Sequence, residues 1–255
     1  MIPGIDVSGW QGEIGWEEVA RFGIKWAGIR ATYGTMPDGT FKRNVSDALK
    51  AGIKVLPYHC STTESPEKEA RSFLEVVEEA IWPTAVAIDV EQASGRYQPA
   101  QMVQWIGAFN SVLNTKPTKT VRFIYSNWSF LESLSPHLPS GFAPTQPTSG
   151  AGMHLWLAVW SNSPPPAPEP WRFWSAWQYS SRGEIPGIRG PVDLDLMTED
   201  AFNTAFGAQS PGQSGGPPTI NASDLAALER VRSLLSSAAE AAQEAATLMR
   251  GILGP

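Results

Sequence analysis

The chain has 255 residues and a formal net charge of −6, with 42% hydrophobic and 17% charged residues. This balance is typical of a folded globular protein, and an acidic chain gains nothing from neutralising phosphates, so we expect no nucleic-acid partner. The single cysteine, Cys60, excludes an intramolecular disulfide. Because the three histidines are scattered without metal-ligand spacing, we also expect no metal and no cofactor.

Short apolar runs alternate with helical patterns along the first 207 residues. We expect eight strands: Ile5–Val7, Trp26–Ala31, Lys54–Tyr58, Ala85–Val90, Arg122–Tyr125, Leu155–Val159, Phe173–Gln178 and Val192–Leu196. We expect four helices: Trp16–Arg21, Asn44–Ala51, Pro66–Ala80 and Pro99–Leu113. This alternation favours a parallel sheet, and eight strands favour its closure. Because the helical pattern fades after Tyr125, the sequence predicts an α/β fold, an irregular TIM-like (β/α) barrel whose later strands are joined by loops.

The composition changes after residue 207. Residues 208–220 are rich in Gly, Pro and Ser, which is typical of a flexible linker. Residues 221–255 are rich in Ala and place apolar side chains three and four positions apart, which predicts an amphipathic helix. This helix is compatible with a solvated segment, a segment lying on a membrane or cell envelope, or self-association. Its three Arg and four acidic residues give a net charge of −1, which argues against an anionic surface, so we favour self-association.

Four acidic residues stand at or near the ends of predicted strands: Asp6, Asp89, Glu91 and Asp193. In barrels of this kind the active site forms at the carboxyl ends of the strands. Asp89 and Glu91 are two positions apart, so on a strand they face the same side with Cα atoms roughly 6–7 Å apart. Two carboxylates held so close in a poorly solvated site repel each other, which raises one pKa and suits a general acid. Taken alone, the pair is equally compatible with acids that cap a loop or form ion pairs.

Aromatic and amide side chains accompany these acids. In the segment Gly4–Gly12, Asp6 is followed by a Trp and a Gln. The segment Trp177–Tyr179 places Gln178 between two aromatic residues. The chain has 11 tryptophans, whose ring faces suit the apolar faces of sugars. Most tryptophans are expected in the core, and we expect a minority to line a glycan site.

Five motifs occur in one order along residues 3–207: GIDVSGWQG, the Tyr58–Cys60 segment, AIDVE, WQYSSRG and GPVDLD. Together they resemble glycoside hydrolase family 25, the Chalaropsis-type lysozymes common among phage endolysins and bacterial autolysins. The resemblance implies a flattened, irregular barrel and N-acetylmuramidase activity, which hydrolyses the β-1,4 bond between N-acetylmuramic acid and N-acetylglucosamine in peptidoglycan. It divides the chain into a catalytic barrel over residues 1–207, the linker 208–220 and the helix 221–255.

The resemblance also implies roles for individual residues. Glu91 would be the general acid/base, and Asp89 would orient the substrate's N-acetyl group or stabilise the developing oxocarbenium charge. Asp6 and Asp193 match the other acids of the family's active site. Substrate-binding roles are expected for Tyr33, Tyr58, Tyr125, Trp177, Gln178 and Asp195.

The sequence departs from the family pattern at three positions. The family often has Phe where Cys60 stands, Glu or Gln where Tyr33 stands, and Asn where Asp195 stands. Asp195 is therefore a competitor of Asp193 for the acid role, and we favour Asp193 because it matches the family's Asp. The nucleophile stays open between a carboxylate and the substrate's own 2-acetamido oxygen, and we prefer the acetamido oxygen because the two acids are arranged as in substrate-assisted enzymes.

Two other functions are compatible with parts of the pattern. A catalytically inactive glycan-binding module would keep the aromatic cleft, and a chitinase-like hydrolase would act on N-acetylglucosamine polymers. No stretch approaches 18 uninterrupted apolar residues, so we expect no transmembrane segment. The first residues have neither the basic nor the apolar region of a signal peptide. We therefore expect a protein made in a host cytoplasm and released to the bacterial cell wall during lysis.

Overall fold

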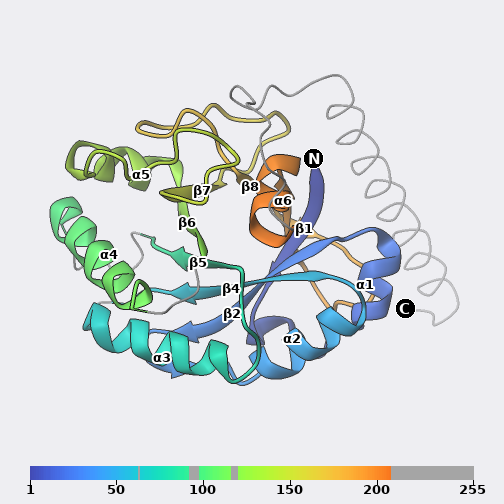
Figure 1. Cartoon of the computed structure of the whole chain (residues 1–255). Helices are drawn as coiled ribbons and strands as arrows, with labels where there is room; N and C mark the ends of the chain where they lie inside the picture. Colours follow the sequence, from blue (N-terminus) through green and yellow to red (C-terminus); the bar gives the residue numbers. More distant parts are fainter. Residues whose placement is uncertain (63, 92–97, 116–119, 208–255) are drawn as a thin grey trace, which may run out of the picture.

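The computed structural model describes residues 1–62, 64–91, 98–115 and 120–207, and these residues form a closed barrel of eight strands with helices outside it (Figure 1). The predicted linker 208–220 and helix 221–255 lie outside the described residues, so self-association through that helix stays a prediction. Within the described ranges, no helix is long and apolar enough to span a lipid bilayer.

The predicted barrel is confirmed. Its strands are β1 (Ile2–Val7), β2 (Trp26–Tyr33), β4 (Lys54–Cys60), β5 (Ala85–Asp89), β6 (Val121–Asn127), β7 (Met153–Ala158), β8 (Ala176–Gly183) and β9 (Val192–Met197). The barrel closes because β1 pairs with both β2 and β9. The short strand β3 (Met36–Pro37) extends β2 as an antiparallel hairpin outside the barrel. Strand β8 begins at Ala176, later than the expected Phe173, and continues to Gly183.

One strand departs from the expected parallel sheet. β9 runs antiparallel to both of its neighbours, β8 and β1, whereas the other barrel strands pair in parallel. The connection between β8 and β9 covers only residues 184–191. A parallel crossover needs a dozen or more residues, so this short connection returns the chain antiparallel. The start of β9 therefore lies at the same face of the barrel as the carboxyl ends of the other strands.

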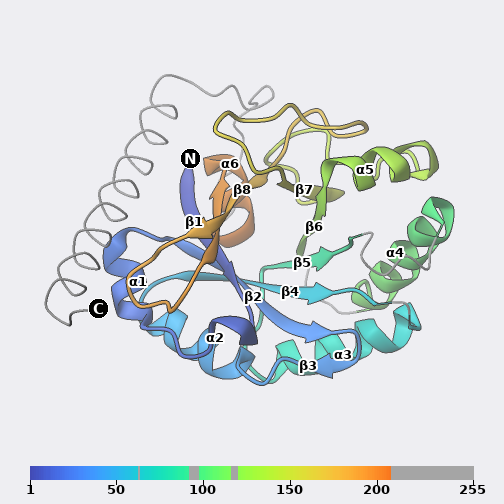
Figure 2. The same cartoon turned by 180° about the vertical axis from the view of Figure 1, so that it is seen from behind.

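Helices cover one side of the barrel more fully than the other (Figures 1 and 2). The four predicted helices are present as α1 (Trp16–Phe22), α2 (Phe41–Lys50), α3 (Pro66–Glu78) and α4 (Pro99–Leu113). Two further helices were not expected, α5 (Trp128–Leu134) and α6 (Glu199–Phe206). Residues 159–175, which are all described, connect β7 to β8 without a helix, and their run of prolines explains why. The expected loop connection is thus found between β7 and β8, whereas α5 lies between β6 and β7.

The apolar core has two parts, inside and outside the barrel wall. One large cluster fills the space between strands and helices, and a smaller cluster around Trp26, Phe123 and Trp156 fills the barrel interior. Ala201 and Ala205 of α6 belong to the inner cluster, so α6 closes the end of the barrel at which the parallel strands begin. Because the interior is filled from that end, a cleft can open only at the opposite face.

Candidate active site

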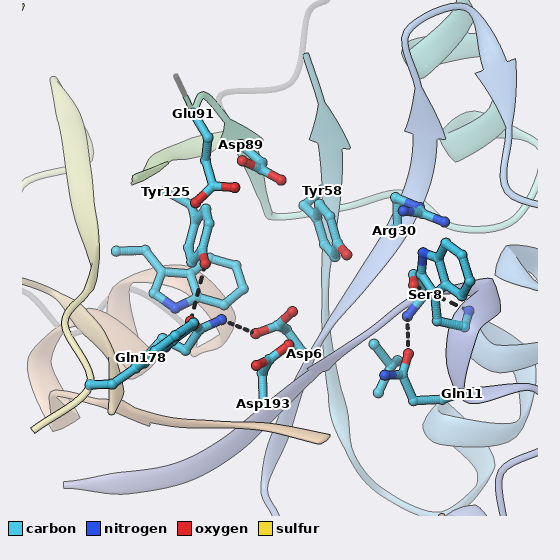
Figure 3. Close-up of a pocket in the computed structure, with 14 residues that line it drawn as sticks. Asp6, Ser8, Gln11, Arg30, Tyr58, Asp89, Glu91, Tyr125, Gln178 and Asp193 are labelled. Atoms are coloured by element: carbon cyan, nitrogen blue, oxygen red, sulfur yellow. Dashed lines mark hydrogen bonds between the residues drawn. The ribbon is translucent and has the colours of Figure 1, made fainter. Parts of the chain in front are cut away.

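A cleft of about 390 Å³ opens at the carboxyl ends of the parallel strands. Its lining includes all four acids expected to be catalytic, namely Asp6, Asp89, Glu91 and Asp193. Figure 3 shows their carboxyl groups converging on one space, with Asp89 and Glu91 on one side and Asp6 and Asp193 on the other. Asp193 joins them although it lies near the start of its strand, because β9 is antiparallel.

Asp89 and Glu91 are held at the end of β5 by the residue between them. Val90 is fully buried, its N–H donates to the carbonyl oxygen of Tyr125 at 3.0 Å, and its carbonyl oxygen accepts from the Ser126 hydroxyl at 2.5 Å. Both backbone polar groups of Val90 are therefore bonded to β6. This anchor fixes the direction of the two carboxylates that flank it.

The electrostatics of this pair favour protonated carboxyl groups. Burial, and then the charge of Glu91, raise the pKa of Asp89 to about 7, while a hydrogen bond from Cys60 and the charge of Arg30 act in the opposite direction. Burial also raises the pKa of Glu91. A carboxyl group with a raised pKa carries a proton near neutral pH, which is the state a general acid needs.

Asp6 and Asp193 face each other across two paired strands. They occupy opposite positions in the β1–β9 ladder, so their side chains leave the sheet on the same side. Burial, followed by the charge of Asp193, raises the pKa of Asp6. Burial, followed by the charge of Glu91, raises the pKa of Asp193 to about 6. The four acids therefore titrate as one interacting group.

Gln178 joins three walls of the cleft through its amide. Its Nε2 donates to Asp6 Oδ2 at 2.8 Å, while its Oε1 accepts from the Tyr125 hydroxyl at 3.1 Å and from Trp160 Nε1 at 2.9 Å (Figure 3). Because two donors meet Oε1, the NH₂ group must face Asp6. The amide thereby fixes the Asp6 carboxylate.

Arg30 supplies positive charge in a cleft lined by acids, and no motif had singled it out. Its Nε donates to Asp38 Oδ2 at 3.0 Å, and the same oxygen accepts from the backbone N–H of Gly9 at 2.8 Å. This ion pair also anchors the loop of Trp10, whose side chain lines the cleft and is 84% exposed. The alternation of β2 is the signal that predicts an inward Arg30, because Arg30 lies two positions after the inward-facing Gly28.

Three residues expected to bind substrate lie away from the cleft. Trp177 is 1% exposed and packs against Trp174 and Tyr179, because it alternates with the inward-facing Gln178. Tyr33 is 52% exposed in the β2–β3 hairpin and does not line the cleft. Asp195 is buried below the cleft. Trp177 therefore packs in the apolar core and does not form part of the cleft wall.

The aromatic lining comes instead from other residues. Tyr58 and Tyr125 line the cleft as expected, together with Trp10, Trp156 and Trp160. Trp160 was missed because it lies just beyond β7 in a segment without a recognisable motif. Trp156 is almost fully buried beneath the two tyrosines, with its ring 5.1 Å from that of Tyr125, and forms the floor.

A barrel with a polar cleft of converging carboxylates belongs to the class of enzymes that work by acid–base chemistry at the carboxyl ends of the strands. Comparison with known proteins makes this class specific. The family described as Glycosyl hydrolases family 25 matches residues 5–188, and the chain belongs to this family. The protein is therefore a glycoside hydrolase.

Individual relatives agree with this assignment. Lysozyme M1 of Streptomyces globisporus is 30% identical over 211 residues, covering 78% of this chain and 69% of that protein. The autolytic lysozyme of Clostridium acetobutylicum is 28% identical over 215 residues, which cover 83% of this chain. The match spans only 60% of that protein's length. The crystal structure of a bacterial lysozyme from Streptomyces coelicolor superimposes with a TM-score of 0.69 at 28% identity, covering 80% of this chain and 96% of that one.

Proposed function

We propose that the protein is an N-acetylmuramidase, a lysozyme that hydrolyses the β-1,4 bond between N-acetylmuramic acid and N-acetylglucosamine in bacterial peptidoglycan. The observation that carries this proposal is the convergence of Asp89 and Glu91, both with raised pKa, on one cleft with aromatic walls. The lysozyme names of the relatives support peptidoglycan as the substrate.

In the proposed mechanism Glu91 is the general acid/base. It protonates the glycosidic oxygen as the bond from C1 breaks, and it later takes a proton from the water that attacks C1. Asp89 orients the substrate's 2-acetamido group, whose carbonyl oxygen closes on C1 in the first step. Asp6 and Asp193 supply negative charge that stabilises the positive charge developing on the sugar ring.

The nucleophile has a direct test. Substrate assistance leaves no covalent bond between sugar and protein, whereas a carboxylate nucleophile forms a glycosyl ester. A glycosyl ester trapped on Asp6, Asp89 or Asp193 and found by peptide mass spectrometry would replace the acetamido oxygen with that carboxylate.

The decisive experiment for the activity is Glu91→Gln, assayed on purified peptidoglycan. Loss of the general acid is expected to lower the rate roughly 10²–10⁴-fold while the fold is unchanged. Glu132→Gln is the matched control, because Glu132 is exposed on α5 and makes no part of the cleft. Near-wild-type hydrolysis by a folded Glu91→Gln variant would refute the assignment.

Product analysis separates the alternative functions. New reducing ends on muramic acid support the muramidase, new ends released from chitin support a chitinase-like enzyme, and binding of glycan without new ends supports an inactive module. Host lysis as a phage endolysin stays a prediction. This prediction is tested by producing the protein inside bacteria. Lysis is expected only after the cytoplasmic membrane has been permeabilised.

A further inference from the structure

Asp195 lies directly beneath the cleft rather than in its wall. Asp195 is 1% exposed, and in the sheet it pairs with Gly4 of β1 and with Gln178 of β8. It follows Asp193 by two positions, so both side chains face the barrel interior. Because β9 runs away from the cleft, Asp195 lies one layer deeper, where substrate does not reach it.

The two oxygens of Asp195 have different surroundings. Oδ1 accepts from Trp156 Nε1 at 2.7 Å. Oδ2 is buried and, among the described residues, meets no donor as long as both aspartates are carboxylates. Its carboxyl group nevertheless lies within hydrogen-bonding range of Asp6. Two carboxylates have only acceptors, so this contact becomes a hydrogen bond only if one of them carries a proton.

We propose that Asp195 is a positioning residue. It stays protonated and donates a hydrogen bond to Asp6, so that Asp6 is held as an ionised carboxylate between two donors. The second donor is the amide of Gln178 at 2.8 Å. The inference rests on the role of Asp6 in the proposed muramidase reaction. It assigns Asp195 a contact with the catalytic machinery in place of a contact with substrate.

The location of the proton on Asp195 follows from the partners of each group. Burial, then the charge of Asp6, raise the pKa of Asp195, and the bond that it donates to Asp6 raises that pKa further. Burial and the charge of Asp193 raise the pKa of Asp6, whereas the Gln178 amide and the same bond act in the opposite direction and stabilise its ionised form. Among these four residues, the only other donor to Asp195 is the Trp156 indole, which serves Oδ1 alone.

The other titratable groups around Asp195 either raise its pKa or are neutral. Asp193, on the same strand, adds negative charge that raises the pKa of Asp195. The hydroxyls of Tyr125 on β6 and Tyr179 on β8 are neutral, because burial raises the pKa of both. None of these groups is a cation, so within the described part of the chain a negative charge on Asp195 would meet only the Trp156 indole N–H.

A protonated Asp195 gives Asp6 a single orientation. One charge shared by the two buried carboxyl groups avoids the repulsion of two adjacent anions. Asp6 then presents a fixed negative charge at the floor of the cleft, opposite Asp193, where positive charge develops on the sugar ring. Loss of the donor leaves Asp6 free to turn or to take up a proton itself.

The first test observes the proton directly and needs no substrate. At about pH 8, above the pKa of about 7 for Asp89, the infrared difference spectrum of wild type minus Asp195→Asn should contain the carbonyl band of one neutral carboxylic acid. Absence of that band would show that Asp195 is ionised and would overturn the proposal. This readout stands even if peptidoglycan proves not to be the substrate.

The second test compares an isosteric variant with a truncation. Asp195→Asn retains an oxygen for Trp156 and an N–H donor for Asp6, so kcat should stay within about threefold of wild type, because one neutral donor replaces another. Asp195→Ala removes the donor and should lower kcat about 10²-fold with little change in KM, because Asp6 is misplaced. Wild type should lose activity at alkaline pH as Asp195 loses its proton, whereas Asp195→Asn should keep it. An Asp195→Asn variant with kcat as low as that of Asp195→Ala would overturn the proposal, and if Asp195→Ala does not fold, the infrared band and the pH profile of Asp195→Asn decide.

Discussion

Asp89→Asn is expected to stabilise the folded protein at neutral and alkaline pH. In the wild type the carboxyl group of Asp89 is buried next to Glu91, and these two factors raise its pKa from 3.8 to about 7. An amide at this position occupies the same space without titrating. The substitution therefore removes a buried charge that the fold tolerates for its function.

The sign and size follow from proton linkage. A group whose pKa is higher in the folded than in the unfolded state contributes stability that is fully present below about pH 4 and is lost as pH rises through about 7. A shift of about three pH units corresponds to about 4 kcal/mol. Water at the mouth of the cleft screens part of this charge, so we expect Asp89→Asn to exceed wild type by about 2–4 kcal/mol at pH 8 and to equal it near pH 4.

Urea unfolding at pH 4, 6 and 8 measures this difference. Asp38→Asn is the control, because its effect on the free energy of unfolding should have the opposite sign. Burial alone would raise the pKa of Asp38, but hydrogen bonds from Thr40 and Gly9 and the charge of Arg30 hold it below its usual value. Asp38→Asn should therefore be less stable than wild type at pH 8, and the deficit should shrink as the pH falls through the pKa of Asp38. A difference for Asp89→Asn that does not vary with pH, or a less stable Asp89→Asn at pH 8, would refute the linkage argument.

Two further predictions concern the support and the walls of the cleft. Glu69→Gln should lower the free energy of unfolding by about 2–4 kcal/mol, because the buried Glu69 carboxylate accepts from His59 Nε2 at 2.9 Å and from Thr62 and Glu64, and an amide cannot accept from all these donors. An unchanged urea midpoint would contradict this. Trp160→Ala should raise KM for peptidoglycan about tenfold, because it removes an aromatic wall and a donor to Gln178. Trp82→Ala, an exposed tryptophan before β5, should leave KM unchanged, and equal effects of both variants would refute the wall role.

The carboxylates were the part of the site that sequence could predict. Asp6, Asp89 and Glu91 each follow a short apolar run, and the carboxyl ends of parallel strands meet at one face, so their convergence followed from strand geometry. Asp193 was placed correctly for a different reason, since β9 is antiparallel and brings its start to that face. The length of the β8–β9 connection contains this information, but only once both strand boundaries are known.

The aromatic walls were harder to predict because adjacent residues of a strand face opposite sides. Trp177 and Gln178 were both expected in the cleft, yet strand alternation allows only one of them there. Gln178 is the one bonded to Asp6, and Trp177 lies in the core. Trp160 follows the end of β7, where no alternation applies. Its position depends on the loop that the later strands use in place of a helix.

The five carboxyl groups at and beneath the cleft form one electrostatic unit, and this is why the site can hold protons near neutral pH. The charge of Glu91 raises the pKa of both Asp89 and Asp193, and Asp193 in turn raises that of Asp6. Among the described residues that line the cleft, Arg30 is the single cation, and it is already paired with Asp38, so it compensates little of this charge. Removing Glu91 should therefore lower the pKa of Asp89 and of Asp193, and the effects of two substitutions among these acids on the pH profile cannot be additive.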